Sequence, residues 1–147
     1  MISECVIDAS VGIKLFVEEP FSDVADRLFD ELANNFEARF YAPDLFFVEC
    51  ANILWKYVRR FGYPPDNARQ DVMDLQALAI RTVSTADLLV PALDLAMTYH
   101  ITTYDASYAA LARQLSLPLI TADERLARRL TEADVRIATL SDLNASL

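Results

Sequence analysis

Five short apolar segments alternate along the chain with longer segments whose apolar residues recur at helical spacing. These segments have the length of strands and span residues 2–8, 37–42, 80–84, 118–121 and 135–140. Strands that alternate with helices in this way favour an α/β layered fold with a mainly parallel sheet, since parallel neighbours need a long crossover between them. We therefore expect a central sheet of about five strands flanked by helices.

Proline and glycine mark where several of the predicted helices begin and end. Prolines 20, 43, 64 and 65 each precede an amphipathic segment, and Gly62 ends the longest one. A proline at position 91 predicts a kink or break inside another helical segment. The segments expected to be helical are 10–19, 21–35, 44–62, 66–78, 84–100, 105–116 and 123–133.

The chain of 147 residues contains no linker-like stretch and no repeat of fixed period. We therefore expect a single domain covering residues 1–147. Glu4 and Asp8 interrupt the N-terminal apolar stretch, so it does not resemble a signal peptide, and no apolar run is long enough to cross a bilayer. Cys5 and Cys50 are isolated cysteines, which is typical of buried thiols in the reducing cytoplasm and not of a disulfide framework.

The formal net charge of −9 limits the ways in which this chain can meet a nucleic acid. A protein that coats phosphates through bulk charge is basic, so phosphate chemistry here requires metal ions or a few well-placed arginines. Residues 1–37 hold nine acidic residues but only Lys14 and Arg27 as bases. Such an acidic N-terminal part favours a basic protein partner.

Four acidic residues follow strands or open helices. Asp8 follows the first predicted strand, Asp123 follows the fourth, Glu49 lies in the helix after the second, and Asp105 opens a helix. The carboxyl ends of parallel strands share one edge of a sheet, where ligands of open α/β sheets bind. We therefore expect these four carboxylates to lie close together.

Ordinary helix capping and solvation are the alternatives for these acids. Aspartate is a favoured N-cap, but Ser10 is equally able to cap the helix that follows Asp8. Thr121 and Glu124 form a T-x-x-E capping box, which predicts that Thr121 caps and leaves Asp123 free. Glu49 fits a solvated stripe and a cleft about equally well, because polar residues follow it and apolar residues precede it on the same face.

Carboxylates that lie close together repel one another and raise each other's pKa, and a divalent cation removes that cost. Oxygen ligands without histidine or cysteine favour Mg²⁺ or Mn²⁺. The single histidine, His100, excludes RNA cleavage by a histidine pair, and we expect it to be structural. The sequence contains no glycine-rich phosphate loop and no nucleophile elbow, which leaves metal-assisted hydrolysis.

Four sequence blocks carry a resemblance to a known family. VIDASV (6–11), FFVECANILW (46–55), TTYDASYAALA (102–112) and PLITADERL (118–126) occur in this order and span most of the chain. Together they resemble PIN-domain ribonucleases, and especially the VapC-type toxins of type II toxin–antitoxin pairs. The resemblance implies a three-layer PIN-like fold and Mg²⁺-dependent endonucleolytic cleavage of structured RNA, often tRNA or rRNA. It also implies homodimers and inhibition by a cognate antitoxin protein.

The resemblance also assigns roles to residues of this chain. The acids of the family fall on Asp8, Glu49, Asp105 and Asp123, and its accessory hydroxyls fall on Ser10 and Thr121. As a hypothesis, the three aspartates hold the metal directly or through water, and Glu49 orients or deprotonates the attacking water or joins the ligands. The basic residues that are candidates for binding RNA are Lys14, Lys56, Arg59, Arg60, Arg125, Arg128 and Arg129.

Two other classes of function remain open from the sequence. A phospho-acceptor receiver would use Asp8 as the acceptor, but it also needs an acid pair near the first strand and a lysine after a late strand. No lysine follows Lys56. A catalytically silent PIN-like binding module would be marked by the loss of one of the four acids, and none is lost.

Overall fold

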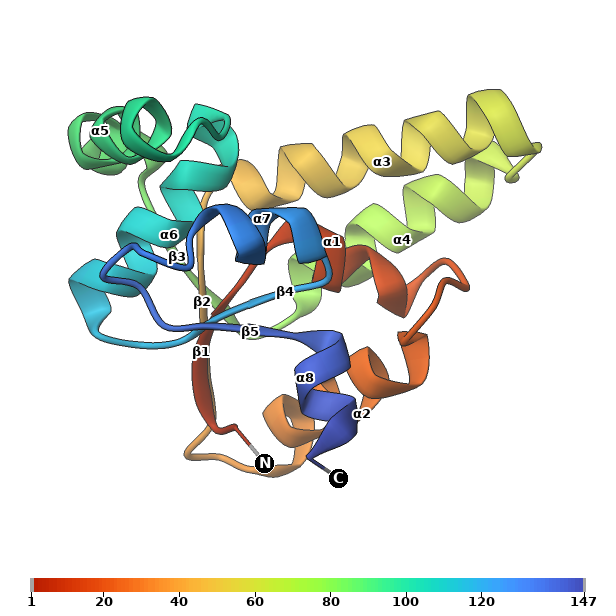
Figure 1. Cartoon of the computed structure of the whole chain (residues 1–147). Helices are drawn as coiled ribbons and strands as arrows, with labels where there is room; N and C mark the ends of the chain where they lie inside the picture. The colour runs from red at the N-terminus through yellow and green to blue at the C-terminus, as the bar shows by residue number, and fades with distance from the viewer. Residues whose placement is uncertain (1, 147) are drawn as a thin grey trace.

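The computed structural model describes residues 2–146 and is built on a five-stranded sheet in which all strands run parallel (Figure 1). The strand order is β3-β2-β1-β4-β5. The expected α/β fold with a parallel sheet is therefore confirmed. The strands are β1 (Glu4–Ile7), β2 (Arg39–Pro43), β3 (Ile80–Val83), β4 (Leu119–Thr121) and β5 (Ile137–Thr139).

Helices flank the sheet, and α3 and α4 lie side by side as a pair that extends away from it (Figure 1). Gly62 ends α3 with a positive φ of 68°, and Pro65 opens α4, as the sequence predicts. The α-helices are α1 (Ala9–Gly12), α2 (Ser22–Asn34), α3 (Leu45–Phe61), α4 (Pro65–Ala77), α5 (Leu89–Tyr99), α6 (Thr103–Leu115), α7 (Glu124–Arg129) and α8 (Leu140–Ala145); Ile13–Leu15 and Thr85–Leu88 form short 3₁₀ helices.

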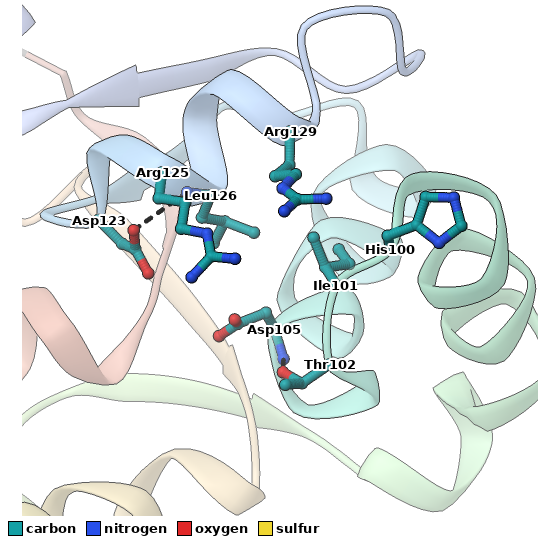
Figure 2. A pocket seen from close by; sticks show the side chains of 8 residues that line it. All are labelled: His100, Ile101, Thr102, Asp105, Asp123, Arg125, Leu126 and Arg129. Carbon is teal, nitrogen blue, oxygen red and sulfur yellow. Dashed lines mark hydrogen bonds between the residues drawn. The ribbon is translucent and has the colours of Figure 1, made fainter.

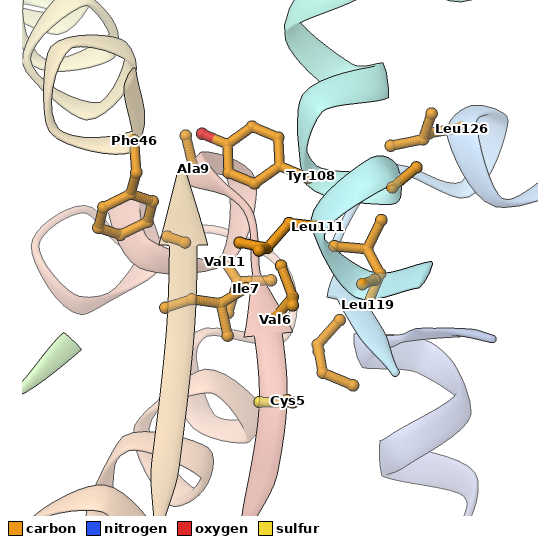
Figure 3. Close-up of a cluster of buried hydrophobic side chains, with 14 of the residues drawn as sticks. Cys5, Val6, Ile7, Ala9, Val11, Phe46, Tyr108, Leu111, Leu119 and Leu126 are labelled. Atoms are coloured by element: carbon orange, nitrogen blue, oxygen red, sulfur yellow. The ribbon is translucent and has the colours of Figure 1, made fainter. Parts of the chain in front are cut away.

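The core forms around β1, the central strand of the sheet. Helices cover both faces of a parallel sheet, and Val6 and Ile7 are accordingly fully buried. Tyr108 and Leu111 of α6 face this strand in Figure 3. Because α6 packs against β1 through these residues, its N-terminal turn is held at one edge of the sheet.

The register of the sheet brings the ends of β1 and β4 together. Ile7 pairs with Ile120, and the backbone N–H of Asp8 donates to the carbonyl oxygen of Ile120 at 3.3 Å. Asp8 and Thr121, which follow this pair, therefore leave the sheet beside one another. This arrangement is the structural basis of the site described below.

Three sequence-based expectations about helices need correction. The segment 84–100 breaks between Leu88 and Leu89 and not at Pro91, which lies in the first turn of α5, where a missing N–H costs no hydrogen bond. Helix α7 ends at Arg129, four residues earlier than expected. Helix α8 was not predicted, although Thr139 and Asp142 form its capping box. Within residues 2–146, no helix is both long and apolar enough to cross a membrane.

Candidate active site

Asp8 lies at the centre of a hydrogen-bond network at the end of β1. The Ser10 hydroxyl donates to its Oδ1 at 2.5 Å, the Val11 N–H donates to the same oxygen at 3.3 Å, and the Thr121 hydroxyl donates to Oδ2. A carboxylate offers about four acceptor positions, so about one remains on Asp8. Asp8 is only 4% exposed, and this remaining position is the one that another ligand can use.

The environment of Asp8 raises its pKa from an ordinary 3.8 to about 7. Burial is the largest cause, because it disfavours the charged form of the carboxyl group. Hydrogen bonds from the Ser10 and Thr121 hydroxyls act in the opposite direction, and the charge of Asp105 raises the pKa further. Asp8 is therefore a carboxylate whose ionised form lacks a full compensating partner.

The sequence offered two candidates for the cap of α1, Asp8 and Ser10. Asp8, not Ser10, is the N-cap residue, since its carboxylate accepts from the N–H of Val11. The Ser10 hydroxyl instead donates to Asp8 and accepts from the N–H of Ala122 at 2.9 Å. Ser10 thus connects the end of β1 to the turn that follows β4.

The capping box predicted at the start of α7 is wrong. Asp123 is the N-cap, and its Oδ1 accepts from the Leu126 N–H at 3.0 Å. Thr121 is fully buried, donates to Asp8 and accepts from the Asp123 N–H at 3.0 Å. Helix α7 begins two residues later than the capping box predicts, because Thr121 is the last residue of β4 and cannot also cap α7. Asp123 caps a helix and still lies at the site.

Glu49 points into the site from the second turn of α3 and is held by a tyrosine. The Tyr108 hydroxyl donates to its Oε1 at 2.6 Å, and the Tyr108 ring is almost completely buried. Burial raises the pKa of Glu49, the Tyr108 hydrogen bond lowers it, and the charge of Asp105 raises it. The sequence patterns assign no role to Tyr108, and the signal that they miss is that a buried phenol needs a partner for its hydroxyl.

Asp105 is the acid that couples the other three. It lies in the first turn of α6, where Thr102 is the N-cap and accepts from the Asp105 N–H at 3.1 Å. Burial raises the pKa of Asp105, followed by the charge of Asp123, and the Thr102 hydroxyl opposes this shift. Since Asp105 in turn raises the pKa of Asp8 and Glu49, all four predicted acids lie within one electrostatic neighbourhood.

The fit of this site to a divalent cation follows from the oxygens that it offers. Among residues 2–146, no three acid, histidine or cysteine side chains converge closely enough to hold a metal ion by themselves. Mg²⁺ usually keeps several waters and takes only one or two carboxylates directly. The remaining acceptor position on Asp8 and the neighbouring Asp105 therefore fit a hydrated divalent cation, and they do not form a closed protein cage.

A hollow of about 200 Å³ lies beside Asp105 and Asp123, between α7 and the turn that joins α5 to α6. Arg125 and Arg129 extend into it from α7 (Figure 2). Neither guanidinium forms an ion pair with a carboxylate in the part of the chain described. This hollow, called the arginine hollow below, thus combines two carboxylates with two cations that have no fixed anion.

The remaining basic candidates lie elsewhere. Arg128 projects from another side of α7, toward a surface hollow near β5. Arg59 is ten residues beyond Glu49 on α3, about 15 Å along the helix, and its guanidinium stacks over Trp55. Lys56 and Arg60 share this distal part of α3.

Lys14 requires a correction. It is only 8% exposed, and its ammonium lies 3.6 Å from a carboxylate oxygen of Glu19. A buried, paired lysine is a poor contact for RNA, so its predicted place on the RNA path is not supported. The sequence pattern gave its charge but not the local turn that folds Glu19 back over it.

His100 lies at the edge of the arginine hollow, which the sequence analysis did not predict. It ends α5 with a positive φ of 57°, and its side chain lines the arginine hollow (Figure 2). Its backbone provides the left-handed cap of α5, while its side chain is exposed. Its side chain is in addition available at the edge of the site.

The chain is similar to a known protein family and to a protein of known activity. Residues 5–130 match the model of the PIN domain. Ribonuclease VapC3 of Pyrobaculum aerophilum is 34% identical over 126 residues, which cover 84% of this chain and 92% of that protein.

Two solved structures share the fold. The protein PAE2754 of Pyrobaculum aerophilum aligns with a TM-score of 0.67 at 22% identity, over 99% of this chain and 97% of its own. The Mycobacterium tuberculosis toxin VapC20, which cleaves the sarcin-ricin loop, aligns with a TM-score of 0.65 at 17% identity. That alignment covers 84% of this chain and 93% of VapC20.

Proposed function

The chain belongs to the PIN-domain family, among the VapC-type ribonucleases, and on this premise we propose that it is a Mg²⁺-dependent endoribonuclease that acts as the toxin of a toxin–antitoxin pair. Its substrate would be structured RNA, with tRNA and rRNA as the first candidates. The observation that carries the proposal is the arginine hollow, in which Asp105 and Asp123 lie beside two guanidiniums that form no ion pair within residues 2–146. A phosphodiester needs both a metal-binding edge and cationic donors, and this hollow offers the two together.

Asp8, Asp105 and Asp123 are the residues that would hold the cation, partly through water, and Mn²⁺ would fit the same oxygens. A bound divalent cation lowers the pKa of water and polarises a phosphoryl oxygen. Ser10 and Thr121 fix the orientation of the Asp8 carboxylate through their hydrogen bonds. These hydrogen bonds keep the remaining acceptor position of Asp8 in a fixed orientation toward the proposed cation.

Glu49 is the proposed base. Tyr108 occupies its Oε1, and Oε2 has no hydrogen-bond partner within the described residues, so this oxygen is available to accept a proton from water. Its raised pKa improves the match of the base to neutral pH. Attack of water on phosphorus breaks the bond to the 3′ oxygen and leaves a 5′-phosphate and a 3′-hydroxyl.

The partners proposed for this chain are an antitoxin and a second copy. Asp23, Asp26 and Asp30 form an exposed acidic stripe along α2, which supports a basic partner protein. Leu89, Val90, Leu93 and Met97 expose an apolar face on α5, which supports a homodimer. Both proposals rest on the family, and both assume a cytoplasmic protein with free Cys5 and Cys50.

The proposal is tested by incubating the purified protein with total RNA in Mg²⁺ and in EDTA and by mapping the new ends. We expect cuts with 5′-phosphate ends in Mg²⁺ and none in EDTA. Asp8→Asn, purified in the same way, controls for a contaminating nuclease and should be inactive. Full cleavage in EDTA or by the variant would refute the proposal, and binding without cleavage would indicate a silent binding module.

The homodimer is tested separately by sedimentation velocity. Leu93→Glu places a charge in the exposed apolar face of α5 and should convert a dimer to monomers. Asp94→Ala, on the adjacent exposed position, is the matched control and should leave the dimer intact. A dimer that persists in Leu93→Glu would place the contact on another surface.

A further inference from the structure

A second hollow lies on the other side of the acids, between α3 and the first turn of α6. It measures about 450 Å³ and is lined by Val48, Glu49, Asn52, Ile53 and Tyr104. Tyr104 directly precedes Asp105, and consecutive residues of a helix point about 100° apart. The two residues therefore line different hollows, one on each side of the same turn of α6. We call the second one the tyrosine hollow.

The walls of the tyrosine hollow differ in chemistry from those of the arginine hollow. Tyr104 and Val48 are 66% and 72% exposed, so their apolar surfaces face the hollow and solvent. Asn52 contributes one amide, with both donor and acceptor atoms. Among the residues that the structure describes, no lysine or arginine lines this hollow, so it offers no cation to a phosphate.

These features fit a nucleobase better than any other part of RNA. A base presents a flat π face that stacks on an exposed aromatic ring, and an edge that an amide can bind. Aliphatic side chains such as Val48 and Ile53 complete a wall for the ring. The arginine hollow meanwhile offers the guanidiniums that a phosphate needs.

We infer that Tyr104 is a base-stacking residue of this ribonuclease, and that the tyrosine hollow takes an unpaired nucleobase next to the phosphate bound between the acids and the arginines. The inference rests on the proposed function, since it places the base relative to the scissile phosphate. A paired base keeps both faces stacked within its helix, so Tyr104 selects nucleotides that are unpaired or flipped out. Tyr104 thereby limits which positions of a structured RNA are cut.

The test compares two forms of one RNA and uses binding, so that it does not depend on cleavage. A fluorescent single-stranded RNA decamer of mixed sequence and its duplex are titrated with the protein in the Asp8→Asn background. The single strand should bind better than the duplex. Tyr104→Leu should weaken binding of the single strand by about 5- to 150-fold and leave the duplex little changed, whereas Tyr104→Phe should retain the preference.

Phe36→Leu is the matched control, because Phe36 is 89% exposed and lies just before β2, at the opposite end of the strands. It should bind both RNAs as the parent does. An equal loss for both RNA forms in Tyr104→Leu, or no loss at all, would overturn the inference, as would an equal effect of Phe36→Leu.

Two further readouts separate this inference from its premises. Sedimentation velocity should give the same oligomeric state for Tyr104→Leu and the parent, since a change would assign Tyr104 to a contact between copies and overturn the stacking role. If the protein with Asp8 intact cut no RNA, the proposed function would be refuted. The binding titration would still decide whether Tyr104 stacks on an unpaired base. In the cleaving protein, we expect mapped cuts at unpaired positions and a reduced kcat/KM for Tyr104→Leu.

Discussion

The hydroxyl of Tyr108 donates a hydrogen bond of 2.6 Å to Oε1 of Glu49, a residue 59 positions earlier in the chain. This contact joins α6 to α3 and orients the carboxylate that we propose as the base. It also lowers the pKa of Glu49, which burial raises. The position and the basicity of one carboxylate therefore depend on a single buried phenol.

Tyr108→Phe should move the acid limb of the pH–rate profile to higher pH. Without the hydroxyl, the pKa of Glu49 rises further, so the ionised form that accepts a proton appears only at a higher pH. The measurement is kcat/KM against pH on a defined RNA. The matched control is Tyr99→Phe, whose hydroxyl bonds a backbone oxygen of Glu132 away from Glu49. An unshifted limb in Tyr108→Phe would contradict the role of Glu49 as base.

Asp8→Asn should remove a pH dependence of stability in metal-free buffer. The folded-state pKa of Asp8, about 7, lies above its ordinary 3.8, so Asp8 contributes stability that is present below about pH 4 and is lost as the pH rises to about 7. The loss should approach about 1.4 kcal/mol per pH unit within that window. Urea unfolding at pH 5, 6, 7 and 8 in EDTA measures the free energy of unfolding.

The difference between the two proteins reports mainly on Asp8, because burial is the largest cause of the raised pKa of Glu49 and of Asp105 and the substitution leaves that burial in place. Asparagine can still accept from one hydroxyl and adds no charge, so the variant should equal or exceed the parent in stability at pH 8 without metal. Addition of Mg²⁺ should stabilise the parent more than the variant, since the ion binds the ionised carboxylate. Parallel pH curves for the two proteins would argue against an uncompensated charge at this position.

Gly12→Ala should destabilise the fold by about 1–3 kcal/mol through overpacking, offset in part by about 1 kcal/mol of helix propensity. A Cβ at this position would lie 2.6 Å from the ring of Phe46, which is fully buried and would have to shift to accept it. Gly62→Ala is the contrasting variant, since it meets no neighbour but keeps a positive φ of 68° and should cost about 1 kcal/mol. Thermal unfolding measures the loss of stability in both variants. A Gly12→Ala variant more stable than the parent would contradict the packing of α1 on α3.

The fold and the acidic edge were predictable because they depend on patterns that are local in sequence. Strand-length apolar runs after each crossover predict a parallel sheet, and that topology alone brings Asp8 and Asp123 to one edge. The capping box predicted for α7 failed because its position depends on where β4 ends. Thr121 pairs as the last residue of β4, which moves the cap to Asp123. The Tyr108–Glu49 contact joins two helices, and no spacing within one helix reveals it.

The basic residues illustrate the same limit. Charge is visible in sequence, but the direction in which a side chain points is not. Arg125 and Arg129 are four residues apart on α7 and share one face, which is the face toward Asp105. Arg128 is one residue from Arg129 and points elsewhere. Lys14 carries the same charge and is buried against Glu19.

This difference in direction leads to a prediction for RNA binding. Arg125→Ala and Arg129→Ala should each weaken binding and reduce the slope of log affinity against log salt by about 0.7, the loss of about one phosphate contact to a single strand. Arg128→Ala is the matched control, since it removes the same charge from the same helix but from another face. Salt titrations of a single-stranded RNA in the Asp8→Asn background measure the slopes. Equal slopes for all three variants would mean that net charge, and not the arginine hollow, binds the phosphate.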